Sequence, residues 1–254
     1  TMQRNWIGKS RGINITFNVK DKEFNHHQLE VYTTRPDTLM GVTYLALAPE
    51  HPLTSDLSKK NNDIAKFVKR CSRQKVSEEE FATVSKIGID TGLKAIHPLT
   101  NDLLPIWVGN YVLIDYGSGA VMAVPGHDQR DFEFAKKYNL KIKQVVSLDK
   151  KDTSINEKAI IEKGNLINSG KYNDLTFNEA FSAIAEDLKE LNQGEVTSNY
   201  RLRDWGVSRQ RYWGAPIPMF NLLSGGEIPI PYDRLPVSLD NQKFNKGERN
   251  NKTQ

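Results

Sequence analysis

The chain has 254 residues, with 38% hydrophobic and 26% charged side chains and a net charge of +4. That length suits one large domain or one domain with a sizeable insert, and the mild charge permits contact with a polyanion without requiring it. No apolar run approaches the roughly 20 residues of a membrane-spanning helix, and the single cysteine, Cys71, excludes an internal disulfide and a cysteine-rich zinc site.

Short apolar runs predict β-strands over residues 13–19, 29–33, 42–48, 93–96, 106–108, 111–113, 120–124 and 142–146. Helical spacing and capping boxes, including Thr176 with Glu179, predict helices over residues 62–74, 77–84, 128–138 and 177–191. Residues 150–171 read as a polar, mobile excursion and residues 235–254 as a disordered tail. Many short strands with scattered helices indicate an α+β fold built around a closed, barrel-like sheet with peripheral helices.

The most informative segment is residues 117–131, where a glycine loop leads into a buried strand that a Pro-Gly pair ends. Asp128 and Asp131 follow, where a helix is expected to begin. With Asp128 as N-cap, Asp131 occupies position N3, and the helix dipole favours ionisation of both carboxylates. Two such carboxylates suit the binding of a small cation or an ammonium group, although plain helix capping explains them equally well.

A second polar group surrounds the proline turn after the predicted strand 29–33. Thr33, Thr34 and Thr38 place three hydroxyls around Pro36, and such a turn can present hydroxyls to a ligand. Taken alone, the pattern favours the structural alternative, in which Thr33 is a strand residue and Asp37 hydrogen-bonds its own backbone.

Other patterns suggest different chemistry. His127 beside Asp128 resembles part of a hydrolase centre, but the remaining histidines are scattered without metal-ligand spacing, so we expect no metal. Asp90, Thr91 and Gly92 match the active-site loop of aspartic proteases, which needs two such carboxylates; this three-residue match ranks low.

Arginines and aromatic residues alternate near the C-terminal end of the chain, a combination that suits nucleic acid because cations pair with phosphates and rings stack on bases. The arginines are Arg201, Arg203, Arg209 and Arg211. An ordinary surface or interdomain contact is the slightly favoured alternative.

Three longer motifs, at residues 33–41, 115–131 and 202–218, together resemble leucyl-tRNA synthetases of the bacterial and organellar branch. The likeness runs from Gln3 to about Pro236 and covers the inserted editing domain (connective peptide 1) with its flanking strands. It implies a linker strand from the synthetase body at 1–12, the editing domain at 13–200, return strands toward the catalytic body at 201–236, and a disordered tail at 237–254. The abrupt chain ends agree with an excised piece.

The resemblance implies a post-transfer editing hydrolase that cleaves the ester of mischarged leucine tRNA by water attack, without a metal or other cofactor. The expected substrates carry isoleucine, methionine or norvaline. The expected partners are the acceptor end of leucine tRNA and the catalytic body of the parent synthetase, with no membrane contact. We expect a monomer, located in the cytoplasm if bacterial or in the mitochondrion if organellar.

The resemblance also implies roles for individual residues. Asp131 would hold the α-ammonium group, Thr38 would exclude leucine, and Thr33 and Thr34 would orient the water and the substrate. The remaining substrate-binding residues would be Arg35, Met122, Val124, Tyr116, His127 and Asp128. Contacts to tRNA would come from Arg201, Arg203, Arg209 and Arg211.

Two absences limit the predicted activity. The sequence contains neither a His-Ile-Gly-His nor a Lys-Met-Ser-Lys-Ser signature, the ATP-site motifs of this synthetase class. We therefore expect no ATP-dependent ligase activity from this chain. The alternative function is a non-catalytic tRNA-binding module that depends on the arginine-rich segment.

Overall fold

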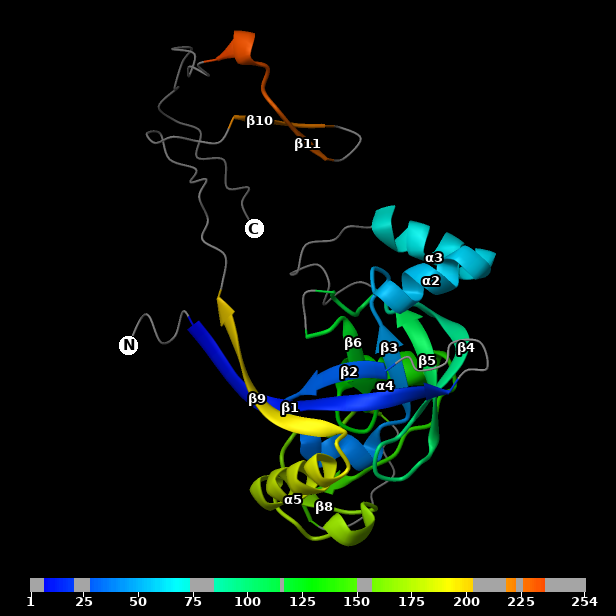
Figure 1. The fold of residues 1–254 in the computed structure, drawn as a ribbon, viewed down its shortest axis with the longest axis vertical. Coiled ribbons are helices and arrows are strands. Elements are labelled where there is room, and N and C mark those ends of the chain that lie inside the picture. Colours follow the sequence, from blue (N-terminus) through cyan, green and yellow to red (C-terminus); the bar gives the residue numbers. More distant parts are fainter. Residues whose placement is uncertain are drawn as a thin grey trace. The chain divides into compact units, whose positions relative to one another are not determined.

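The structure is a computed structural model that describes residues 7–20, 28–73, 85–114, 117–149, 157–202, 218–222 and 226–235 (Figure 1). The chain divides into two compact units, Thr1–Arg201 and Leu202–Gln254. The predicted helix 77–84, Tyr116, Arg203, Arg209 and Arg211 lie outside the described residues, as does the predicted tail beyond residue 235.

A seven-stranded mixed sheet forms the centre of the first unit within the described residues, in the order β2-β1-β4-β5-β3-β6, and β9 also pairs with β1. Its strands are β1 (Ile7–Lys20), β2 (Gln28–Thr33), β3 (Tyr44–Leu47), β4 (Gly88–Ile96), β5 (Leu103–Gly109), β6 (Ala120–Ala123) and β9 (Gly194–Leu202). β3 and β5 are parallel, whereas β3 and β6 are antiparallel. The α+β prediction is therefore confirmed.

A closed barrel is not found among the described strands. The two ends of the sheet path, β2 and β6, approach one another, and the Ser118 hydroxyl donates to the Glu30 carbonyl, but no ladder between these strands is seen in the described part of the chain. Gly117 and Gly119 have φ values of 63° and 75°. Such left-handed positions favour glycine, and they form the turn directly before β6.

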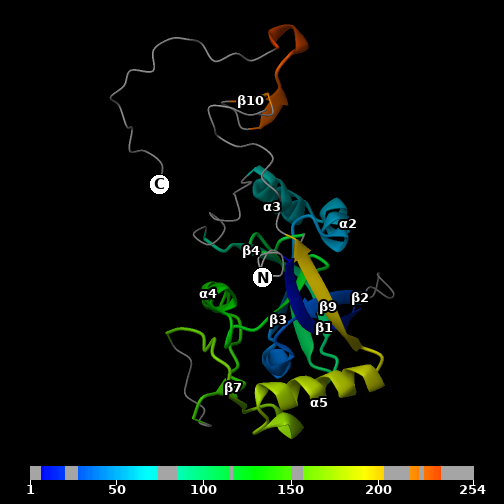
Figure 2. The same ribbon diagram turned by 90° about the vertical axis from the view of Figure 1, so that its left-hand side faces the viewer.

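The main core lies between the sheet and helix α5 (Phe177–Glu190), which runs along the lower side of the sheet in Figures 1 and 2. Alternate residues of β1 point into it, and Ile13, Ile15 and Phe17 are fully buried. The predicted capping box of α5 is present, since the Thr176 amide donates to the Glu179 carboxylate at 2.8 Å. Alternation thus correctly predicted the buried face of β1, and the capping box correctly predicted the start of α5.

A second, aromatic core holds helix α4 (Gln129–Lys137) against the sheet. Phe134 is its centre: the ring centroid lies 5.4 Å from Tyr44 and 4.5 Å from Tyr138. Trp107 and Tyr111 also contact the Phe134 ring. This cluster fixes the first turn of α4, where Asp128 and Asp131 lie.

The remaining elements include one helix that the sequence reasoning missed. Helix α2 (Pro52–Lys60) begins at His51, whose Nδ1 accepts from the Leu53 amide, and α3 (Asn62–Arg73) follows it as predicted. The short elements are η1 (Pro36–Gly41), β7 (Val146–Ser147), β8 (Asn165–Leu166), η3 (Gly170–Tyr172), β10 (Met219–Asn221), β11 (Glu227–Pro229) and η4 (Tyr232–Arg234). No described helix is both long and apolar enough to cross a bilayer.

Three local predictions were wrong. Residues 111–113 form a turn in which Tyr111 and Val112 pack in the aromatic core, and residues 142–145 are irregular, with Ile142 packed against the same core. The described part of the expected excursion, from residue 157 onward, is packed: Ala159 and Leu166 are buried, and β8 pairs with β7.

We expect Phe134→Ala to lower the free energy of unfolding by about 3–5 kcal/mol, because it removes the centre of the aromatic core and leaves a cavity. Urea unfolding followed by circular dichroism measures the change. Lys136→Ala, on the outer face of α4, is the control and should change stability by less than about 0.5 kcal/mol. A loss no larger than the control would show that α4 is held by other contacts.

Candidate functional site

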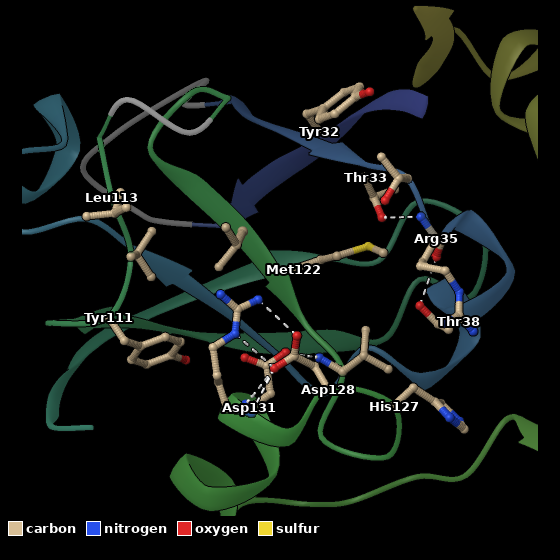
Figure 3. Close-up of a pocket in the computed structure, with 15 residues that line it drawn as sticks. Tyr32, Thr33, Arg35, Thr38, Tyr111, Leu113, Met122, His127, Asp128 and Asp131 are labelled. Carbon is tan, nitrogen blue, oxygen red and sulfur yellow. Dashed lines mark hydrogen bonds and ion pairs between the residues drawn. The ribbon is translucent and has the colours of Figure 1, made fainter. Parts of the chain in front are cut away.

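A pocket of about 370 Å³ opens between the turn after β2 and the first turn of α4 (Figure 3). Three segments supply its walls: the end of β2 with η1, the turn after β5, and β6 with the start of α4. Its lining consists of Tyr32, Thr33, Thr34, Arg35, Thr38, Tyr111, Val112, Leu113, Val121, Met122, Val124, His127, Asp128, Arg130 and Asp131. The polar residues singled out from two distant motifs therefore share one cavity.

The wall that carries the carboxylates is a tight strand-to-helix connection. The amides of His127 and Asp128 both donate to the Val124 carbonyl at 2.9 Å. Asp128 is the N-cap of α4, and its carboxylate accepts from the amides of Arg130 and Asp131. Asp131 then turns back toward the strand and accepts from the Val124 amide at 2.8 Å. Capping therefore explains Asp128, whereas Asp131 does not cap the helix.

The two carboxylates differ in their electrostatics. Burial opposes the ionisation of Asp128, but the paired Arg130 guanidinium, 3.0 Å away, and two backbone amides lower its pKa. Burial and the Asp128 charge raise the pKa of Asp131 from 3.8 to about 8. The expectation that both carboxylates are ionised was therefore wrong for Asp131, because burial outweighs the helix dipole at this position.

The opposite wall is a turn whose Thr33, Arg35, Asp37 and Thr38 side chains are held by hydrogen bonds. The Thr33 hydroxyl accepts from the Arg35 amide at 3.0 Å, and the Thr38 hydroxyl donates to the Arg35 carbonyl at 2.8 Å. The buried Asp37 carboxylate holds the Arg35 guanidinium through bonds of 2.8–3.2 Å. The alternative in which Asp37 bonds its own backbone is thus replaced by an ion pair that fixes Arg35.

Two buried histidines support these walls, and hydrogen bonding fixes the neutral tautomer of each. His97 donates from Nε2 to the Leu39 carbonyl in η1, while its Nδ1 accepts from the amides of Leu99 and Thr100. In His127, Nε2 accepts from the amides of Val145 and Val146.

The Nδ1 of His127 then carries the proton and donates to the Ile160 carbonyl at 2.9 Å. Burial lowers the pKa of both rings. With both nitrogens engaged, neither histidine is placed to act as a general base or as a metal ligand.

The pocket also contains residues that sequence reasoning missed. Tyr32, Tyr111, Val112, Leu113, Val121 and Arg130 line it. The Tyr111 hydroxyl lies 2.9 Å from that of the buried Tyr44, and in Figure 3 it points toward the two carboxylates. Arg130 could have been predicted as a pocket residue, because it lies between Asp128 and Asp131 in the sequence. No local sequence pattern indicates Tyr111.

The other predicted residues are placed as follows. Thr34 is exposed at the pocket, and Met122 and Val124 line it from β6 and the residue after it. Arg201 contributes backbone to β9, but its side chain, like Tyr116 and the other three arginines, lies outside the described residues.

The rival chemistries have no support in the described residues. Asp90 lies outside the pocket at a register shift of β4, where its carboxylate accepts from the Gly92 amide and Gly92 has φ of 76°. The Asp-Thr-Gly sequence is thus explained by a β-bulge. Across the described ranges, no three His, Cys, Asp or Glu side chains are grouped so as to hold a metal ion.

Comparison with known proteins identifies the family of the chain. The model of the family "Leucyl-tRNA synthetase, editing domain" matches residues 4–189. The chain belongs to this editing-domain family. The model "tRNA synthetases class I (I, L, M and V)" matches residues 185–253 of the same chain.

Relatives of this editing domain are much longer proteins. The leucine–tRNA ligase of Saccharophagus degradans is 58% identical over 240 residues, which is 94% of this chain and 29% of the relative. That of Marinobacter nauticus is 60% identical over 240 residues, 94% of this chain and 28% of the relative. The chain thus spans less than a third of their length.

A similar solved structure is the ternary complex of Agrobacterium radiobacter K84 agnB2 LeuRS, tRNA and LeuAMS. It has a TM-score of 0.59 and 34% identity, and the match covers 97% of this chain and 27% of that one.

We expect the buried Asp131 to make stability depend on pH. The folded chain keeps this proton up to about pH 8, whereas the ordinary pKa is 3.8. The unfolding free energy should therefore fall as pH rises from about 4 to about 8, with a contribution of up to about 1.4 kcal/mol per pH unit. Asp131→Asn, which keeps an oxygen for the Val124 amide, should lack this slope in urea titrations. Parallel curves for both proteins would show that Asp131 ionises normally.

Proposed function

We propose that this editing domain hydrolyses the ester of mischarged leucine tRNA. The observation that carries the proposal is the buried Asp131 carboxylate, which no described side chain pairs with in a salt bridge and which faces a rigid threonine turn across the pocket. Such a carboxylate favours the binding of a ligand that carries a positively charged group. The α-ammonium group of an aminoacyl ester is such a group.

The chemical need for a second site follows from the size of the side chains. A difference of one methylene provides only about 1–3 kcal/mol of discrimination, and aminoacyl-tRNA synthetases for small apolar amino acids are the known case in which a hydrolytic site removes the errors. We propose isoleucine, methionine and norvaline as the amino acids removed here.

Binding in the pocket begins with Asp131. The arriving ammonium group offsets the burial that favours the neutral acid, so Asp131 loses its proton and forms an ion pair. The other face of the amino acid meets Thr38, whose hydroxyl is already engaged by the Arg35 carbonyl. A side chain held in this way is a fixed steric wall, and we propose that it excludes the branched end of leucine.

Hydrolysis then requires a water molecule near the ester carbon. The Thr33 hydroxyl accepts from the Arg35 amide and keeps its own proton available, and the Thr34 side chain is exposed at the pocket. We assign both to water and substrate orientation, together with the ribose hydroxyl of the substrate. The water oxygen bonds to the carbonyl carbon, the ester bond to the ribose breaks, and the ribose oxygen takes up the proton that the water loses.

The partners proposed for the chain follow from the same family. The similar Agrobacterium structure is a LeuRS–tRNA complex, and we propose the acceptor end of leucine tRNA and the remainder of the synthetase as partners here. A purely tRNA-binding module is the alternative, and the following experiment separates the two.

We expect the chain to deacylate isoleucyl-tRNA but not leucyl-tRNA, both on leucine tRNA, and Asp131→Ala to lower the first rate on the order of 100-fold or more, because the ammonium loses its anchor. Release of labelled amino acid gives the rates, and filter binding gives RNA affinity, which should change little. If wild type and Asp131→Ala hydrolysed the isoleucyl ester at the same rate, Asp131 would not be the anchor of the ammonium group. Binding without any hydrolysis would favour the non-catalytic module.

Replacing the proposed gate gives an independent test. Thr38→Ala should raise hydrolysis of the leucyl ester on the order of 10-fold or more, because the steric wall becomes shorter, while hydrolysis of the isoleucyl ester persists. Thr38→Ser, which keeps the hydroxyl, is the intermediate comparison. A leucyl ester that stays intact with Thr38→Ala would mean that another residue excludes leucine.

A further inference from the structure

A short segment far from both motifs crosses the outside of the pocket walls. We name residues 159–161 the strap. The Ala159 amide donates to the Gln129 side-chain oxygen at 3.0 Å, and the Ile160 amide donates to the Gly126 carbonyl at 2.9 Å. In the other direction, the Ile160 carbonyl accepts from His127 and the Ile161 carbonyl accepts from Arg35 at 3.1 Å.

These contacts connect the two walls of the pocket. Gly126, His127 and Gln129 belong to the connection that carries the carboxylates, whereas Arg35 belongs to the turn that carries Thr38. The Arg35 guanidinium has its other bonds to Asp37 within the same turn. The hydrogen bond from Arg35 to the Ile161 carbonyl therefore links the orientation of Arg35 to the wall that carries the carboxylates.

The strap uses its backbone, and the side chains that hold it come from the motif segments. The Ile161 side chain is 61% exposed, whereas Ala159 is 5% exposed where it packs beside Gln129. Gln129 is exposed and does not line the pocket. His127 joins the strap to the Val145 and Val146 amides, and its neutral ring is saturated with partners.

We propose that Gln129 and His127 are positioning residues of the editing pocket: they hold the strap, and the strap fixes Arg35 and with it the distance between the threonine turn and Asp131. The inference rests on the proposed function, since the property that it explains is selectivity. Leucine and isoleucine have the same number of atoms, so a wall that shifts by a fraction of an ångström loses its ability to separate them.

A matched pair of variants at Gln129 tests the role of the strap. Gln129→Met removes the acceptor of the Ala159 amide, whereas Gln129→Glu keeps an oxygen there. Both remove the bond from the Gln129 side-chain nitrogen to Glu133. Gln129→Glu also places a second carboxylate four residues from Glu133, a like-charge pair that costs about 0.2–0.5 kcal/mol, so retained protection in this variant is evidence for the oxygen alone. Amide hydrogen exchange should accelerate at Ala159 and Ile160 in Gln129→Met and stay close to wild type in Gln129→Glu.

The selectivity readout is the ratio of kcat/KM for the isoleucyl and leucyl esters. We expect Gln129→Met to lower this ratio about fivefold, the change that the loss of one hydrogen bond produces, and Gln129→Glu to stay within about twofold of wild type. Faster exchange with an unchanged ratio would show that the strap serves stability alone. Unchanged exchange would show that Gln129 does not hold it.

A separate binding measurement distinguishes failure of the strap from failure of the proposed function. The probe is adenosine whose ribose carries isoleucine or leucine through an amide, which cannot be hydrolysed as an ester. Calorimetry on the whole chain gives the affinities for the isoleucyl and leucyl probes. Gln129→Met should lower the ratio of these affinities, as it lowers the ratio of kcat/KM. A wild type that neither hydrolyses the esters nor binds the probe would refute the proposed function and the strap with it.

Discussion

The hydrogen bond from the Val124 amide to the Asp131 carboxylate joins the end of β6 to the first turn of α4, and the pocket depends on it. Asp128 caps the helix, so Asp131 is not needed there and turns back to the strand. One of its oxygens is thereby fixed while the side chain still lines the cavity. Two carboxylates are needed on the proposed function, because Asp128 is used in capping the helix and Asp131 remains for the ligand.

The opposite wall of the pocket, the turn that carries Thr38, is held rigidly by hydrogen bonds. The Thr38 hydroxyl bonds the Arg35 carbonyl, Arg35 is held by Asp37, and His97 donates to Leu39 in the same 3-10 turn. Each of these bonds is worth only about 1 kcal/mol by itself. Together they remove rotamer freedom from the turn. On the proposed function, this rigidity keeps the Thr38 wall in place against leucine.

The sequence predicted those features that local patterns determine. Alternation located β1, the capping box located the start of α5, and Asp128 was identified as an N-cap. It failed where distant contacts decide: helix α2 begins at a histidine, an uncommon cap, and Tyr111 enters the pocket because its ring packs on Phe134. The motifs predicted most of the lining, but the strap contacts use backbone groups, which no side-chain pattern reveals.

The protonation of Asp131 connects burial with selectivity for the ligand. The helix dipole favours ionisation by about 0.3–1 kcal/mol, whereas burial together with the Asp128 charge raises the pKa to about 8. The same low-polarity surroundings strengthen an ion pair once a cation arrives. On the proposed function, an ester with a free ammonium group offsets the burial of the carboxylate, whereas an N-acylated one does not. The carboxylate would therefore recognise the charge of the amino acid, and the threonine wall would recognise the shape of its side chain.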